Sequence, residues 1–159
     1  MPVNLTRPSE HAEVSRIVSD RDADRLVELV FAAPRRFWRV AEEPLARHGL
    51  GAAHYRALAS VRRAESQPVS SLRRRLGVRK QSLARVLAEL EEWGFIARAA
   101  GAVDKRVRLI ALTAKGRAAE REATNALRER AAVVFAAAGP EAVAAARLVL
   151  AMLAGEDHG

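Results

Sequence analysis

The 159-residue sequence contains no cysteine, few aromatic residues and no long apolar run. Without cysteine the chain can form neither disulfides nor zinc sites with thiolate ligands, and it cannot sense redox state through thiols. Aromatic residues make up 4% of the chain, a composition that favours closely packed helices over a β-sandwich. No stretch reaches the roughly 18 to 20 apolar residues that a membrane span needs, so we expect a cytoplasmic protein that does not bind membranes.

The sequence also lacks the patterns that enzymes and metal sites require. No Ser-His-Asp order, paired carboxylates or phosphate-binding glycine loop provides a candidate catalytic site. The histidines have no metal-ligand spacing, although a glycine turn between two of them, His48 and His54, could bring that pair close together. We therefore predict no enzyme activity, no metal and no cofactor.

The charge of the chain is basic and concentrated in one segment. Lysine and arginine number 27 against 19 acidic residues, which gives a formal net charge of +8. Residues 70–108 contain ten basic and four acidic side chains, so this segment alone accounts for +6. Such a concentration indicates a phosphate-rich or otherwise anionic partner. For the Arg73 to Arg75 run taken alone, a solvated helix face is the commoner explanation.

Residues 1–18 are polar and aperiodic, and we interpret them as a flexible arm. A long helix is predicted over residues 19–48, because Ser19 and Asp22 have capping-box spacing and apolar residues then recur at helical intervals. Pro34 and Pro44 fall inside this segment. They are expected to bend or interrupt the helix, since each removes an intrahelical donor.

The next segments predict two short helices joined by a tight turn. Ser70 is a candidate N-cap of the first, and Gly77 is placed to end it in a left-handed conformation. The second begins near Arg79, and its apolar residues form one narrow stripe: Leu83, Val86, Leu87 and Leu90. The opposite face of this second helix is polar near the N-terminal end of the helix.

After Gly94 the pattern predicts a β-hairpin with a small polar connection, followed by a long helix that Thr113 can cap. Gly139 and Pro140 are expected to end this helix, and a last helix follows that is apolar on nearly every side. Such a helix must be buried, and in so short a chain a second subunit is the natural partner. Membrane-surface binding fits less well, because the helix lacks a lysine- and arginine-rich face.

Two short helices with a glycine turn, followed by a hairpin, are typical of a winged helix-turn-helix. The stretches "LRRRLGVRKQSLARVLAELEEWGFIAR" and "DKRVRLIALTAKGR" resemble the helix-turn-helix and the wing of the MarR family of bacterial transcription regulators. The resemblance implies a mainly α fold with a small β-hairpin wing and terminal dimerisation helices. Its parts would be an arm (1–18), an N-terminal dimerisation helix (19–48), a DNA-binding domain (50–112) and C-terminal dimerisation helices (113–155).

The same resemblance implies the function. Members of the family are homodimers that bind pseudo-palindromic operators in double-stranded DNA. Many release the DNA when a small anionic or aromatic molecule enters the crevice between the winged lobe and the dimerisation helices. We therefore expect a sequence-specific, ligand-responsive regulator that represses by occluding a promoter.

The candidate DNA-binding residues divide by their expected contacts. Gln81, Ser82 and Arg85 face outward near the start of the second helix and are candidates for reading base edges. The candidates for phosphate contacts are Arg73, Arg74, Arg79, Lys80 and Arg98. By resemblance, Asp104, Lys105 and Arg106 form the wing, with Arg106 in the minor groove and Asp104 orienting it. The candidate dimerisation residues are Leu26, Val30, Val134, Phe135, Leu148, Leu150 and Leu153.

Other interpretations remain at this point. A winged helix can also bind protein or RNA, in which case the basic face would serve a ribosomal or polymerase surface. Alternatively, the chain could be a ligand-binding member of the family that has lost DNA affinity. Phe37, Trp38 and Trp93 could line a ligand crevice, but aromatic residues at helical spacing more often pack in a core, and we assign them no ligand role.

Overall fold

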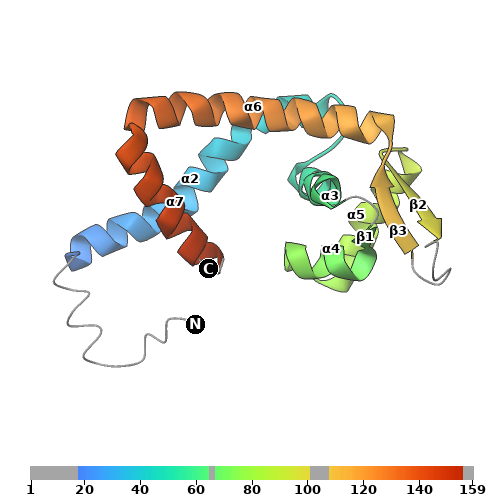
Figure 1. Ribbon diagram of the computed structural model, residues 1–159, viewed down its shortest axis with the longest axis horizontal. Coiled ribbons are helices and arrows are strands. Elements are labelled where there is room, and N and C mark those ends of the chain that lie inside the picture. The colour runs from blue at the N-terminus through green and yellow to red at the C-terminus, as the bar shows by residue number, and fades with distance from the viewer. Residues whose placement is uncertain (1–17, 65–66, 101–107, 156–159) are drawn as a thin grey trace. The chain divides into compact units, whose positions relative to one another are not determined.

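The computed structural model describes residues 18–64, 67–100 and 108–155 (Figure 1). Among the described elements, a long helix comes first in the sequence, a group of short helices and strands follows, and two further helices come last. In chain order they are α2 (Asp20–Ala46), α3 (Ala52–Arg63), β1 (Gln67–Pro68), α4 (Val69–Leu76), α5 (Lys80–Glu92), β2 (Ile96–Ala100), β3 (Arg108–Leu112), α6 (Ala114–Ala138) and α7 (Pro140–Ala154). The predicted arm, residues 1–18, lies outside the described residues except for its last position.

The chain forms two compact units. Residues Trp38–Arg128 make up the first, which we call the winged unit. The described residues before Trp38 and after Arg128 belong to the second, the terminal unit. The boundaries fall inside α2 and α6, so each of these two long helices contributes one part to each unit.

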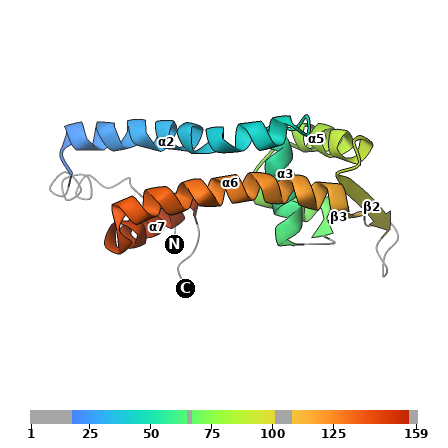
Figure 2. The ribbon, with the colours of Figure 1, turned by 90° about the horizontal axis from the view of Figure 1, so that it is seen from above.

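Helix α2 begins as predicted and is continuous despite its two prolines. Ser19 Oγ accepts a hydrogen bond from the Asp22 backbone amide at 3.2 Å and donates one to the Asp22 carboxylate at 2.6 Å. The expected interruption is not found, because a single helix runs through Pro34 and Pro44 (Figure 2). Each proline removes only one intrahelical donor, and the buried ring of Pro44 packs in the winged unit.

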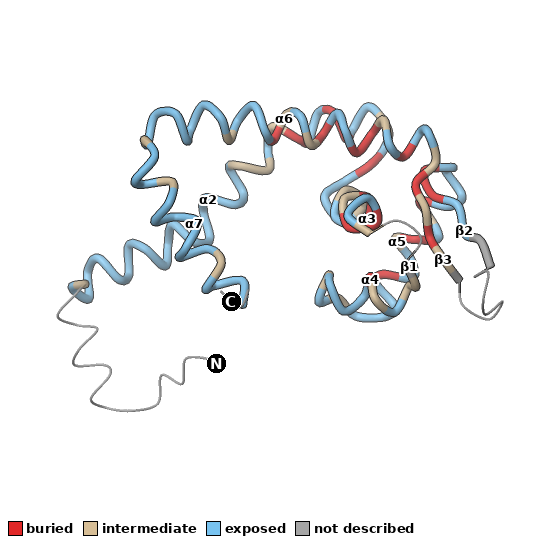
Figure 3. Tube along the Cα trace, in the orientation of Figure 1, coloured by how far each residue is buried: buried red, intermediate tan, exposed pale blue. Residues whose placement is uncertain are grey.

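The core of the winged unit lies where α3 packs against α4, α5 and β3. The apolar stripes of these elements converge there, as the helical spacing predicted, and Figure 3 shows buried residues in this region and along the part of α6 that belongs to the winged unit. The fully or nearly fully buried side chains include Leu58, Val61, Leu72, Leu87, Leu90, Phe95, Ile96, Ile110 and Leu112.

The predicted hairpin is part of a three-stranded antiparallel sheet in the order β1-β3-β2. Strands β2 and β3 pair from Ile96 opposite Leu112 to Ala100 opposite Arg108. Strand β1 adds Gln67 and Pro68 to the other side of β3, and no pattern in the sequence predicted this strand. A proline is tolerated there because an edge strand needs no inward-facing donor at that position.

Strand β1 also changes how α4 begins. The prediction that Ser70 caps this helix was wrong: the N-cap is Pro68, without a side-chain hydrogen bond, and α4 already starts at Val69. The extended conformation of Pro68 ends the strand and leads straight into the helix, so Ser70 lies within the first turn.

In the terminal unit, the last two helices meet at Gly139, whose φ of +82° favours glycine, and Pro140 occupies the first position of α7. No residue of α7 is buried within the single chain, although its mean composition is strongly apolar. In Figure 3, α7 is therefore drawn mostly in pale blue, the colour of exposed residues. The apolar surface of the terminal unit is therefore largely exposed in one chain.

Candidate nucleic-acid interface

The turn between α4 and α5 is fixed by the backbone. Gly77 has a left-handed φ of +60°, and its amide donates to the carbonyls of Arg73 and Arg74 at 3.1 and 3.3 Å. This capping satisfies carbonyls at the end of α4. The chain then enters α5 after two residues, which is the compact helix-turn-helix that the sequence predicted.

Helix α5 has one buried and one exposed face. Leu83, Leu87 and Leu90 are buried, whereas the base-reading candidates Gln81, Ser82 and Arg85 are all exposed. No side chain among the described residues caps the N-terminus of α5 at Arg79. The first-turn amides of the helix are therefore open to an anion, and Arg79 and Lys80 add exposed positive charge beside them.

The three arginines of α4 have different surroundings. Arg75 donates to the backbone carbonyl of Ser60 in α3 at 3.0 Å, so this side chain helps to join the two helices. Arg73 and Arg74 are exposed, and Arg74 also donates to Ser71 Oγ at 3.3 Å. The sequence had singled out Arg73 and Arg74 as phosphate candidates, and both remain accessible on the surface.

Arg98, the phosphate candidate on β2, forms an ion pair with Glu91 of α5 at 3.1 Å. Its guanidinium is thus partly neutralised, which the sequence did not indicate. The wing candidates Asp104, Lys105 and Arg106 lie outside the described residues.

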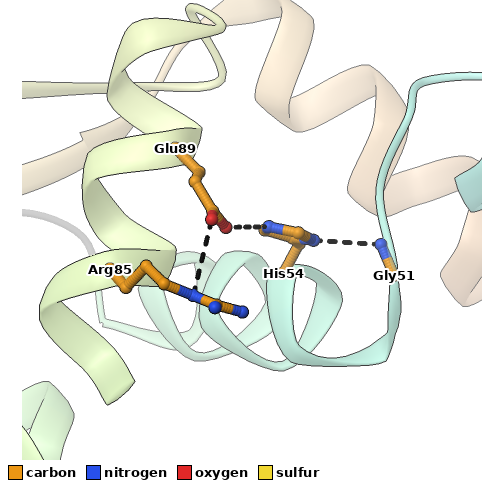
Figure 4. Close-up of polar contacts among 4 residues, drawn as sticks. All are labelled: Gly51, His54, Arg85 and Glu89. Atoms are coloured by element: carbon orange, nitrogen blue, oxygen red, sulfur yellow. Dashed lines mark hydrogen bonds and ion pairs between the residues drawn. The ribbon is translucent and has the colours of Figure 1, made fainter. Parts of the chain in front are cut away.

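A chain of polar contacts joins the exposed face of α5 to the start of α3 (Figure 4). Arg85 Nε lies 3.5 Å from one carboxylate oxygen of Glu89, and the other oxygen lies 2.9 Å from His54 Nε2. The His54 Nδ1 atom in turn accepts a hydrogen bond from the Gly51 amide at 3.0 Å. Sequence reasoning missed these contacts, although the four-residue spacing of Arg85 and Glu89 was a usable signal.

A second network joins α3 to α6 around the buried Glu120. Its Oε1 atom accepts hydrogen bonds from Arg62 Nε at 2.8 Å and from Thr124 Oγ1 at 2.7 Å. The Tyr55 hydroxyl lies 2.9 Å from Thr124 Oγ1, and the Trp38 ring packs edge-on against Tyr55 with centroids 5.1 Å apart. Trp38 thus takes part in packing, as we had interpreted it.

The described part of the chain holds no cluster of three or more side chains suited to a metal ion. His48 and His54 do not face each other: His48 lies 3.2 Å from Glu122, and His54 contacts Glu89. Within the same described ranges, no helix is long and apolar enough to cross a membrane.

All the predicted dimerisation residues are exposed side chains of the terminal unit: Leu26, Val30, Val134, Phe135, Leu148, Leu150 and Leu153. Phe31, which is not among the predicted residues, is more exposed than any of them at 72%. A hollow of about 440 Å³ opens between the end of α6 and α7, lined by Phe135, Val143, Ala146, Arg147, Leu150, Ala151 and Ala154.

Comparison with known proteins agrees with this geometry. Residues 48–107 match the MarR family. The chain is 39% identical over 138 residues to the HTH-type transcriptional regulator PetP of Rhodobacter capsulatus, covering 87% of this chain and 83% of PetP.

Two solved structures share the fold. One is CouR from Rhodococcus jostii RHA1 bound to p-coumaroyl-CoA, with a TM-score of 0.73 at 22% identity. The match covers 86% of this chain and 96% of the CouR chain. A MarR mutant from E. coli complexed with operator DNA has a TM-score of 0.66 at 24% identity, covering 81% and 93%. With its winged helix-turn-helix, the chain belongs to the MarR family of DNA-binding transcription regulators, which are not enzymes.

Proposed function

We propose that the protein is a homodimeric repressor that binds a pseudo-palindromic operator and releases it when a small molecule binds. The observation that carries the proposal is the exposed face of α5, where Gln81, Ser82 and Arg85 stand beside the open N-terminus of the helix. A helix with this arrangement can enter a major groove and present hydrogen-bonding side chains to base edges. The site of action would be the cytoplasm, where a bacterial regulator meets duplex DNA.

Within the interface, phosphate and base contacts have separate roles. Arg85 is suited to the two acceptors of a guanine, and Gln81 to the donor and acceptor of an adenine. The side chains that would neutralise phosphates are Arg73, Arg74, Arg79 and Lys80. Arg98 would also contact a phosphate, and its ion pair with Glu91 would then break. The wing proposal for Asp104, Lys105 and Arg106 rests on their sequence motif.

Replacing Arg85 and Lys80 separately by alanine tests this division. Arg85→Ala should cost about 1 to 3 kcal/mol of binding free energy and relax the preference for one base pair in each half-site. Lys80→Ala should weaken binding to all sequences alike and reduce the salt dependence by about one ion per subunit. Titrations of operator and base-substituted duplexes at several salt concentrations measure both effects. An equal loss on every duplex for both variants would contradict the assignment of Arg85 to base reading.

Dimerisation is supported by the exposed apolar surface of the terminal unit, because monomeric proteins rarely leave so many large apolar side chains uncovered. A second copy of the chain would bury these side chains and fill the hollow beside α7. Two winged units would then be held at a fixed separation, which sets the spacing of the operator half-sites.

Leu150→Asp is expected to weaken the dimer, because Leu150 is 63% exposed in the single chain and lines that hollow. Burying a carboxylate there should raise the dimer dissociation constant by at least about tenfold. Sedimentation velocity over a range of concentrations measures the change. Ala88→Asp, which adds the same charge on the exposed face of α5, is the control and should leave sedimentation unaltered. Identical sedimentation of both variants and the wild type would refute the proposed interface.

Release by a ligand is supported by the likeness in fold to CouR, whose structure contains p-coumaroyl-CoA. A ligand can lower DNA affinity only by as much as it prefers the conformation that does not fit the operator. A screen of aromatic acids and their thioesters for loss of operator binding tests this part of the proposal.

A further inference from the structure

We propose that Glu89 and His54 are positioning residues that orient Arg85 for reading a base, and thereby determine specificity at one operator position. This inference rests on the proposed function, because the proposed function assigns a base contact to Arg85. Its basis is the chain of contacts from Arg85 through Glu89 and His54 to the Gly51 amide (Figure 4).

The contact between Glu89 and Arg85 leaves the outer end of the arginine available. Glu89 faces the Nε atom at 3.5 Å, whereas a guanine is recognised end-on through the two Nη groups. The Arg85 side chain is 80% exposed and Glu89 only 29%, so the carboxylate lies against the protein while the guanidinium extends outward. Glu89 can therefore hold Arg85 in a binding conformation without occupying the atoms that contact the base.

Glu89 is itself fixed by His54. Because His54 Nδ1 accepts the hydrogen bond from the Gly51 amide, the proton of the neutral ring must be on Nε2, which donates to Glu89 at 2.9 Å. The His54 side chain is mostly buried, and its ring lies 5.4 Å from that of Trp93. The carboxylate thus has a rigid support on α3, unlike an isolated exposed pair on one helix, which orders its side chains weakly.

An amide cannot replace the carboxylate in this role. Glu89 forms an ion pair with Arg85 through one oxygen and accepts a hydrogen bond from His54 with the other, whereas glutamine carries no charge and offers a single acceptor oxygen. Glu89→Gln therefore breaks one link and preserves size and helix propensity. Glu91→Gln makes the same charge change on the same helix, but its partner is Arg98, so it is the matched control.

His54→Gln tests the other link. His54 occupies the third position of α3, where a glutamine can also accept the Gly51 amide as in a capping box. The variant should keep the helix start, and hence the thermal stability, and lose the ring that holds Glu89. A melting curve for each variant separates a loss of orientation from a loss of folding.

The experiment uses the full-length protein and a duplex that the wild type selects from a random 30-base-pair pool. The measured quantity is the ratio of affinities for this duplex and for the same duplex with the Arg85-dependent base pair exchanged. Glu89→Gln and His54→Gln should each lower the ratio about threefold or more, and Glu91→Gln should leave it at the wild-type value. In an Arg85→Ala background, Glu89→Gln should have no further effect on the ratio.

An unchanged ratio in Glu89→Gln, or an equal loss in the Arg85→Ala background, would overturn the positioning role and leave the proposed function intact. Selection by the wild type that enriches no sequence would instead contradict the proposed function, and this inference with it. The two failures are therefore distinguished by the wild-type protein alone.

Discussion

Gly116→Ala should destabilise the winged unit by about 3 kcal/mol or more, the largest effect that we expect from a single methyl group in this chain. A Cβ atom at Gly116 would lie 1.9 Å from the Phe95 carbonyl oxygen and 2.9 Å from the carbonyl carbon. Both are backbone atoms, so no side-chain rotation can relieve the overlap. At an unobstructed position inside a helix, the same substitution would stabilise the protein by about 1 kcal/mol. The sign of the change in unfolding free energy therefore shows whether the Phe95 carbonyl obstructs this position.

The Phe95 carbonyl cannot easily move away. Its oxygen accepts a hydrogen bond from the Thr113 amide at 3.0 Å, and the Thr113 hydroxyl donates to the preceding carbonyl, that of Gly94, at 2.7 Å. The Phe95 side chain is buried. The same hydroxyl caps α6 by accepting the Gly116 amide at 3.0 Å. The start of α6 and the start of β2 are thus joined at one point that admits no side chain.

Chemical denaturation of the purified variants measures this effect. Gly51→Ala is the control, because the added methyl group would meet nothing closer than His54 Nδ1 at 4.0 Å. Its cost should be about 1 kcal/mol or less, which is usual for alanine at an N-cap. A Gly116→Ala variant as stable as the wild type would show that the two segments are not in such close contact.

Arg62→Ala should cost about 2 to 3 kcal/mol, because it leaves the carboxylate of Glu120 buried without its cation. The Glu120 side chain is only 2% exposed and depends on Arg62 and on the Thr124 hydroxyl. The cost is set below that for a fully buried pair, since the Arg62 side chain is 43% exposed and partly screened by water.

The exposed neighbour Arg63 provides the matched control, because Arg63→Ala removes the same charge from the same helix. The free energy of unfolding should differ from the wild type by about 0.5 kcal/mol or less for this control. Adding Glu120→Gln to Arg62→Ala should recover part of the stability, since a neutral side chain is less costly to bury. Equal midpoints for Arg62→Ala and Arg63→Ala would refute a stabilising role for the Arg62 pair.

Local patterns in the sequence predicted the elements that depend on neighbouring residues. The period of Leu83, Leu87 and Leu90 identified the buried face of α5, and therefore also the exposed face that carries Arg85. Gly77 and Thr113 were recognised because turns and caps require particular residue types within a few positions.

Contacts between distant residues escaped the same reasoning. The pairs Arg62–Glu120 and His54–Glu89 are 58 and 35 residues apart, and nothing local links their members. One signal for Glu120 was present: it lies on the stripe of small and apolar residues that α6 buries, where a charge needs a partner. Strand β1 was missed because two residues, one of them proline, carry no alternating pattern.

The most direct test of the central claim is a titration of the full-length protein against its selected duplex, with random duplex as competitor, at several salt concentrations. We expect saturation by a dimer and a preference of about 10³ or more over random DNA that persists as salt rises. Weak binding that disappears equally on both duplexes with added salt would contradict sequence-specific recognition through α5. The basic segment would then serve a protein or RNA partner.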